Sequence, residues 1–181
     1  HNSGYLRNLS LELNSIKRVL ERAEDHLLCQ LYVLPNATLE DLIHTFQRES
    51  FRDRIAIFHY GGHANSYDLM LEDDKGELTK ARGEGLIPFL SQQKGLQLVF
   101  LNGCFSVKQA KELLEAGIPA VIGTVNAVDD SIATKLSSSF YQALAEGSTI
   151  DQSWKEATYL LQAQNGTQEL GVYYQKSNND T

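Results

Sequence analysis

The sequence lacks the features that mark several large classes of protein. Only 2 of its 181 residues are Cys, which excludes the disulfide framework of small secreted domains and favours a reducing compartment. It has no clustered tract of Lys and Arg, and its formal net charge of -7 argues against direct contact with nucleic acid. No apolar run is long enough to cross a bilayer, and no signal peptide opens the chain. We therefore expect a cytoplasmic protein that binds neither nucleic acid nor a membrane.

What remains is an ordinary globular composition. Hydrophobic residues make up 42% of the chain and charged residues 22%, and the length suits one domain with a substantial core. We predict a single domain over residues 1–181. The chain begins with His1 rather than Met, so we interpret it as a fragment or module of a larger protein.

Apolar periodicity predicts an α/β fold with a mainly parallel sheet. Helical segments alternate with short apolar runs, in the order helix, strand, helix, strand, hairpin, helix, strand, helix, strand, helix, helix, with a last edge strand. A doubly wound sheet normally begins with a strand, so we expect a first strand upstream of His1. The predicted helices cover residues 6–24, 38–46, 85–92, 107–116, 132–144 and 150–161, and the predicted strands cover 27–34, 55–60, 67–71, 77–79, 98–101, 120–123 and 172–174.

Two of the apolar runs end in residues that could carry chemistry. The run 98–101 is followed by Asn-Gly and then Cys104, and the run 55–60 is followed by Gly-Gly and then His63. If these strands are parallel neighbours, both carboxyl ends lie at the same edge of the sheet, where ligands collect in open α/β folds. His63 and Cys104 would then meet as general base and nucleophile.

Two segments have the form of a capping box, in which a Ser or Thr and a residue three positions later close the first turn of a helix. One is Ser106 with Gln109, and the other is Thr149 with Gln152. The first box would place Cys104 between the end of a buried strand and a helix N-terminus, which helps to stabilise a thiolate.

Each candidate residue also has a purely structural interpretation. Free cysteines are among the most buried residue types, but the place of Cys104 after a glycine at a strand end favours a nucleophile. Cys29 lies inside a predicted strand, so we expect a core residue without a role. His59 also lies in a predicted strand, so we expect it either in the core or in support of the site residues, and His63 could be a loop histidine without a role. The two cysteines have no metal-ligand spacing, and no Lys-Ser/Thr pair follows Gly61-Gly62 as a phosphate loop requires.

The order and spacing of several motifs resemble the CHAT domain family over nearly the whole chain, from residue 6 to residue 172. The motifs are, in order, His59-Tyr60-Gly61-Gly62-His63-Ala64 followed by a hairpin, Leu101-Asn102-Gly103-Cys104, Gly117-Ile118-Pro119-Ala120-Val121-Ile122-Gly123, Asp129-Asp130-Ser131-Ile132-Ala133 and Phe140-Tyr141-Gln142-Ala143-Leu144-Ala145-Glu146-Gly147. CHAT domains are caspase-like cysteine peptidases, often fused in bacteria to tetratricopeptide repeats or other modules. The resemblance implies a caspase–haemoglobinase fold with helices on both faces of the sheet.

The resemblance also implies a Cys–His dyad. His63 would act as general base and acid, and Cys104 as the nucleophile that attacks a peptide carbonyl. The backbone N–H groups of Ala64 and Cys104 would form the oxyanion hole. Caspases proper carry Gly where this chain has Ala64, a difference without consequence if only the N–H is used. No cofactor or metal is implied.

Asp129 and Asp130 lie in a segment that, in the caspase-like fold, helps to wall the S1 pocket. A carboxylate there would suit a basic P1 side chain of the substrate. The rival interpretation, which we favour, is that one of the two caps the next helix, as Asp often does.

We therefore expect a cysteine endopeptidase that cleaves a protein or peptide substrate. The resemblance implies that it is the gated effector module of a bacterial signalling or defence protein, with a regulatory domain or partner. Two alternatives stay open from the sequence. One is a catalytically silent, caspase-like interaction module, and the other is a flavodoxin-like ligand binder, which would not need Cys104.

Overall fold

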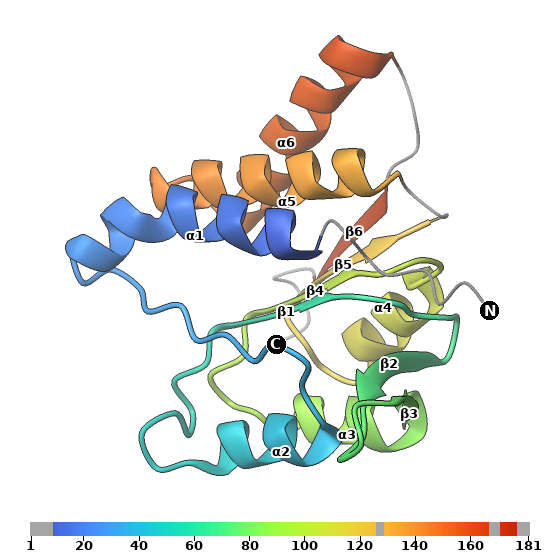
Figure 1. The fold of residues 1–181 in the computed structure, drawn as a ribbon. Helices are drawn as coiled ribbons and strands as arrows, with labels where there is room; N and C mark the ends of the chain where they lie inside the picture. The colour runs from blue at the N-terminus through green and yellow to red at the C-terminus, as the bar shows by residue number, and fades with distance from the viewer. Residues whose placement is uncertain (1–8, 126–128, 167–170, 177–181) are drawn as a thin grey trace. The chain divides into compact units, whose positions relative to one another are not determined.

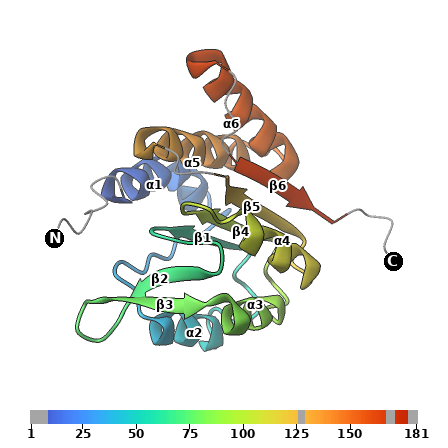
Figure 2. The same ribbon diagram turned by 90° about the vertical axis from the view of Figure 1, so that its right-hand side faces the viewer.

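The computed structural model describes residues 9–125, 129–166 and 171–176, and the chain divides into two compact units (Figures 1 and 2). One unit comprises residues 1–32 and 128–170, and the other comprises residues 33–127 and 171–181. The expectation of one domain over the whole chain stays a prediction.

The described part of the first unit is made of three helices. They are α1 (Leu9–Asp25), α5 (Asp130–Ala145) and α6 (Ile150–Asn165), and α5 packs against both of the others (Figure 1). All three confirm the helices predicted from apolar periodicity, although the predicted start of the first one, Leu6, lies outside the described residues. Buried apolar side chains on these helices include Ile16, Leu136, Phe140 and Leu161.

A buried carboxylate lies in the packing of α1 against α5. Glu12 is 6% exposed, and one of its oxygens accepts a hydrogen bond of 2.6 Å from the hydroxyl of Ser137. Burial, and then the charge of Glu12, raise the pKa of the Tyr141 phenol, so this hydroxyl stays protonated. The contact between α1 and α5 therefore combines apolar packing with a buried polar link.

The second unit is organised around a sheet with the strand order β1-β4-β5-β6. β1 (Ile57–Gly61), β4 (Leu98–Asn102) and β5 (Ala120–Thr124) are parallel, and β6 (Gly171–Gln175) is an edge strand antiparallel to β5. Every residue of β4 and β5 is buried, which explains why these strands are continuous apolar runs in the sequence. The predicted α/β fold with a mainly parallel sheet is confirmed. β1 forms the other edge, and the strand expected upstream of His1 stays a prediction.

Three helices of the same unit share an apolar core with the sheet. They are α2 (Leu39–Gln47), α3 (Gly83–Ser91) and α4 (Val107–Glu115), and a hairpin of β2 (Asp68–Glu72) and β3 (Leu78–Arg82) lies beside α3 (Figure 2). These elements share one apolar core, whose buried members include Leu42, Phe46, Leu69, Leu86, Leu90, Val99, Leu101, Leu113 and Val121. The hairpin and the three helices confirm the sequence prediction.

Local signals set the ends of several helices. Thr38 accepts a hydrogen bond from the Asp41 amide at 3.1 Å, and Asp41 accepts one from the Thr38 amide at 3.0 Å, which completes a capping box on α2. The amide and then the hydroxyl of Thr38 hold the pKa of Asp41 below its usual value. α4 ends just before Gly117, whose φ of 116° suits glycine. Thr149 accepts from the Gln152 amide at 3.2 Å, so that half of the second predicted box forms.

The strand predicted over residues 27–34 is wrong. This segment follows α1 without regular structure, and Leu27 and Leu28 are 90% and 74% exposed. A strand is stable only when a neighbour pairs with its backbone, and none of the described strands pairs with this segment. One of its amides, that of Leu31, instead donates to the carboxylate of Glu24 at 2.7 Å.

We expect Ser137→Ala to lower the free energy of unfolding by about 1–3 kcal/mol, because the buried Glu12 carboxylate loses a hydrogen bond. Ser148→Ala is the matched control, since Ser148 also donates to a glutamate, Glu156, but at 3.4 Å and on the surface. It should change the free energy of unfolding by less than about 0.5 kcal/mol. Urea denaturation followed by circular dichroism measures both, and equal effects of the two substitutions would contradict this account of α1 and α5.

Candidate active site

The candidate site lies where β1 and β4 end side by side. The two strands pair in parallel, and their last pair in register is Gly61 with Asn102. The amide of Gly62 donates to the Asn102 carbonyl at 3.4 Å, which continues the pairing beyond the strands. His63 and Cys104 each follow the last pair by two residues, so both lie beyond the carboxyl end of the same sheet, and both are half-buried. The parallel pairing that the sequence analysis required is therefore present.

Close packing of the backbone joins the loop of His63 to the loop of Cys104. A Cβ atom on Gly103 would lie 2.8 Å from the carbonyl oxygen of Gly62 and 2.8 Å from Cβ of Ala64. The residue before Cys104 thus touches the residues on both sides of His63. Only glycine fits at position 103, because the Gly62 oxygen belongs to the backbone and the Ala64 Cβ is bonded directly to it, so neither atom can turn aside as the end of a long side chain could.

The hydroxyl of Tyr60 anchors the backbone around His63. It lies within hydrogen-bonding distance of two carbonyl oxygens, that of His63 and that of Met70, the latter at 2.8 Å. It also accepts a hydrogen bond from the Met70 amide at 3.2 Å. Burial raises the pKa of this phenol, so the hydroxyl keeps the proton that it donates. A Cβ on Gly62 would lie 2.6 Å from the Tyr60 oxygen, which explains the glycine before His63. The sequence analysis missed Tyr60, whose only signal is a hydroxyl at the end of an apolar strand.

Two buried hydroxyls, those of Ser106 and Thr124, anchor the loop after β4. The capping box expected from Ser106 and Gln109 is therefore wrong, because Ser106 has other partners. Ser106 makes no capping hydrogen bond with its side chain. Its hydroxyl donates to the Leu101 carbonyl at 2.9 Å and accepts from the Thr124 amide at 2.9 Å. The Thr124 hydroxyl in turn donates to the Gly103 carbonyl. These bonds fasten both ends of the loop to the sheet, because Leu101 and Thr124 belong to β4 and β5.

Phe105, the residue after Cys104, has a left-handed backbone with a φ of 60° and a side chain that is 51% exposed. Such a conformation costs a bulky residue about 1–3 kcal/mol and persists only where the surrounding structure imposes it. Here the hydrogen bonds on either side of Phe105 impose it, namely that of the Thr124 hydroxyl to the Gly103 carbonyl and those of the Ser106 hydroxyl to Leu101 and Thr124. The resulting sharp turn leads the chain from β4 into α4 and leaves Cys104 at the bend.

Two side chains of α4 reach the segment that follows His63. Gln109, which is 2% exposed, donates from its amide to the Asn65 carbonyl at 2.6 Å. Lys108 places its ammonium 3.8 Å from the centre of the Tyr67 ring, a cation–π contact. Because α4 follows directly on the loop of the candidate nucleophile, these contacts hold the two loops together. Spacing along the sequence gave no sign of them, since each joins segments about 40 residues apart.

Asp129 caps a helix of the first unit. Its carboxylate accepts hydrogen bonds from the hydroxyl of Ser131 at 2.6 Å and from the Ser131 amide at 2.8 Å, at the start of α5. These two bonds, in that order, hold the pKa of the Asp129 carboxyl below its usual value. This is the capping role that the sequence favoured, and a part in substrate binding stays a prediction. The side chain of Asp130 lies outside the described residues.

The other cysteine, Cys29, lies on the surface, and the first histidine of the motif, His59, lies in the sheet. Cys29 is exposed, so its expected place in the core is wrong, because the strand predicted around it does not form. His59 lies in β1, half-buried, with its ring centroid 4.8 Å from that of Phe100. This contact agrees with the expected structural place of His59.

A comparison with known families identifies the family of this chain. The family model described as CHAT domain matches residues 5–176 of the chain. The chain belongs to the CHAT domain family. This confirms the resemblance drawn from the motifs, and because the family is caspase-like, the chain is a protease-like module. A comparison with curated proteins finds no match.

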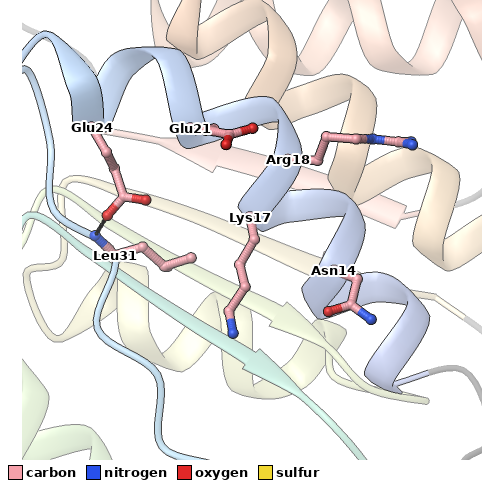
Figure 3. A pocket seen from close by; sticks show the side chains of 6 residues that line it. All are labelled: Asn14, Lys17, Arg18, Glu21, Glu24 and Leu31. Carbon is pink, nitrogen blue, oxygen red and sulfur yellow. Dashed lines mark hydrogen bonds between the residues drawn. The ribbon is translucent and has the colours of Figure 1, made fainter.

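Two hollows are present on this CHAT domain. The smaller, of about 410 Å³, runs along α1 in the first unit and is lined by Asn14, Lys17, Arg18, Glu21, Glu24 and Leu31 (Figure 3). Figure 3 shows the Glu24 carboxylate turned toward the Leu31 amide, and the lining has neither a nucleophile nor a histidine. The larger, of about 640 Å³, is lined by the β2–β3 hairpin with its flanking residues, α3 and α4. Neither hollow is lined by His63 or Cys104.

Within residues 9–125, 129–166 and 171–176, no group of three or more His, Cys, Asp or Glu side chains is arranged to hold a metal ion. Among the helices that the structure describes, none has both the length and the apolar character needed to cross a membrane. The cytoplasmic location of this CHAT domain stays a prediction.

We expect Gly103→Ala to destabilise the CHAT domain by about 1–3 kcal/mol, because the added methyl pushes against Gly62 and Ala64. Gly85→Ala is the matched control. A Cβ on Gly85 would meet nothing within 4 Å, and in α3 the change should stabilise by up to about 1 kcal/mol. Thermal and urea unfolding measure both variants. A Gly103→Ala protein as stable as the wild type would show that the two loops are not in close contact.

We expect Cys29 to react slowly with iodoacetamide at neutral pH, although it is exposed. Partial desolvation and then the charge of Glu24 raise the pKa of the Cys29 thiol, so the thiolate fraction at neutral pH falls and the alkylation rate rises only in more alkaline solution. Glu24→Gln should speed the reaction in part, since it removes the charge while its amide oxygen can still accept from Leu31. Peptide mapping by mass spectrometry measures the rate, and a Cys29 that reacts as fast as free cysteine would contradict the shift.

Proposed function

We propose that this CHAT domain is a cysteine endopeptidase with Cys104 as nucleophile and His63 as general base. The observation that carries the proposal is the parallel, in-register pairing of β1 with β4, which brings the loops of both residues to one end of the sheet. The contact of Gly103 with Gly62 and Ala64 supports it, because it ties the two loops together at the candidate dyad.

In the proposed reaction the thiol of Cys104 loses its proton to the imidazole of His63, and the sulfur attacks the carbonyl carbon of a peptide bond. The tetrahedral intermediate collapses when the carbon–nitrogen bond breaks, and the imidazolium gives its proton to the leaving amine. Water, activated by the same imidazole, then hydrolyses the thioester and restores the thiol. The Cys–His pair thus supplies both the nucleophile and the proton transfers.

The backbone N–H groups of Ala64 and Cys104 are the proposed oxyanion hole. Ala64 forms an isolated β-bridge with Leu69, and the two hydrogen bonds of this bridge run between the residues that flank that pair. Neither bond uses the amide of Ala64, as an oxyanion-hole donor requires. The bridge also holds the backbone of Ala64 to the start of β2, so the amide has a set direction.

A protein or peptide is the proposed substrate. The hollow of about 640 Å³ is lined in part by Tyr67 and Asp68, which follow His63 closely, and it offers a concave surface to an extended chain. Asp129 and Asp130 are the proposed receptors of a basic P1 side chain. Following the family resemblance, we also propose that a regulatory domain or partner gates this module within a bacterial signalling or defence protein, in the cytoplasm and without a cofactor.

We expect peptidyl electrophiles with different P1 residues to form an adduct on Cys104, read by intact mass. Cys104→Ala should abolish the adduct, and His63→Ala should slow its formation by roughly 10²–10⁴-fold, the usual contribution of a positioned base. Cys29→Ala and His44→Ala are the matched controls, because neither Cys29, which is exposed, nor His44, which is half-buried in α2, belongs to the two loops. Both should label like the wild type.

The panel also distinguishes the alternatives. A preference for a basic P1 residue that Asp129→Asn weakens would support the proposed S1 role, and no P1 preference would leave only its capping role. A folded wild-type protein that forms no adduct on Cys104 with any member of the panel would contradict the endopeptidase. That result would instead favour the catalytically silent interaction module.

A further inference from the structure

Gln109 makes a contact that its position in α4 does not explain. By its spacing from Ser106 it should close a capping box, yet its amide nitrogen lies 2.6 Å from the Asn65 carbonyl oxygen and its side chain is 2% exposed. A buried amide is stable only when its hydrogen-bonding groups are satisfied, so such a group selects a partner with the right geometry. The partner here belongs to the segment that follows His63.

The turn at Asn65 transmits this contact to His63. The side-chain oxygen of Asn65 accepts hydrogen bonds from the backbone amides of Tyr67 and Asp68, each at 2.8 Å. The backbone amide of Asn65 donates to the Asp68 carbonyl at 3.0 Å. These bonds make residues 65–68 a compact, internally bonded turn. Because His63 lies two residues before Asn65, the place of the turn helps to decide the place of the imidazole.

The other end of the contact is fixed to the Cys104 loop. Gln109 lies in the first turn of α4, five residues after Cys104. The hydroxyls of Ser106 and Thr124 fasten the start of that helix to β4 and β5 through buried hydrogen bonds. Gln109 therefore connects a loop that is held to the sheet with a turn that carries the candidate base.

We propose that Gln109 is a positioning residue for the dyad, which sets the distance between His63 and Cys104 by tying Asn65 to α4. This inference rests on the proposed function, because Gln109 acts through His63. Glutamine suits the task, since its amide donates to a carbonyl that a carboxylate or an apolar side chain would leave unpaired. A displacement of the base by about 1 Å is enough to slow a reaction roughly 10²-fold.

The experiment measures alkylation of the full chain by iodoacetamide across a range of pH, with the rates at Cys104 and Cys29 read separately by peptide mapping. Cys29 is exposed in the first unit and serves as an internal control in every variant. The variants are Gln109→Met, which keeps the volume and removes the donor, and Gln109→Asn, which keeps a polar group and shortens the reach. His63→Ala defines the profile of a protein without the base.

Gln93→Met is the matched control. Gln93 also donates from its side-chain amide to a backbone carbonyl, that of Phe89 at 2.8 Å, and it is half-buried, two residues after the end of α3. We expect this variant to keep the wild-type pH profile at both cysteines. Thermal unfolding of each variant establishes that it is folded before its profile is compared.

We expect both Gln109 variants to slow the alkylation of Cys104 at neutral pH by roughly tenfold or more, with a pH profile that moves toward that of His63→Ala. The rate at Cys29 should not change. A merely structural role would lower the melting temperature and leave the pH profile of Cys104 as it is, so a folded Gln109 variant with the wild-type profile overturns the inference. If one variant does not fold, the other decides. Identical profiles for the wild type and His63→Ala would overturn the proposed function itself.

Discussion

The candidate site depends on the parallel pairing of β1 with β4 in a single register. Because Gly61 lies opposite Asn102, His63 and Cys104 leave the sheet at the same level. A slip by one residue would displace one loop by about 3.3 Å and turn every side chain of a strand to the opposite face. β4 is buried at all of its positions, so the packing around it opposes such a slip. The apolar core of the sheet thereby sets the geometry of polar residues that lie outside it.

Buried polar bonds then hold the loops at the end of these strands. The hydroxyls of Tyr60 and Thr124 and the amide of Gln109 each satisfy a backbone carbonyl in one of the two loops. The hydroxyl of Ser106, a residue of the loop after β4, bonds instead to the backbone of β4 and β5. Leaving such a group unsatisfied costs about 1–3 kcal/mol, so each bond selects one loop conformation out of many. Under the proposed function, this is preorganisation, because the base and the nucleophile are placed before the substrate arrives. The strained backbone of Phe105 is sustained by the same bonds.

The sequence predicted well those features that depend on local pattern and on burial. The apolar runs of β4 and β5 and the helical stripes are direct consequences of packing, and they identified the elements and the end of the sheet where the candidate site lies. The strand around Cys29 failed because pairing needs a neighbour, which an apolar run by itself does not show. The capping box of Ser106 with Gln109 failed because both side chains have partners distant in sequence, on Thr124 and Asn65. Candidate chemistry is visible in a sequence, while the groups that position it become visible only in the fold.

The most direct test of this account is whether residues 63 and 104 are neighbours in solution. His63→Cys in a Cys29→Ser background leaves two thiols, at positions 63 and 104. A short bifunctional reagent that reacts with thiols, and that fluoresces only when it has bridged two of them, reports their proximity. We predict rapid bridging between positions 63 and 104. The control is Asp73→Cys in the same background, at the turn of the β2–β3 hairpin, which should bridge slowly. Bridging of position 63 no faster than that of position 73 would contradict the placement of His63 and Cys104 at one end of the sheet.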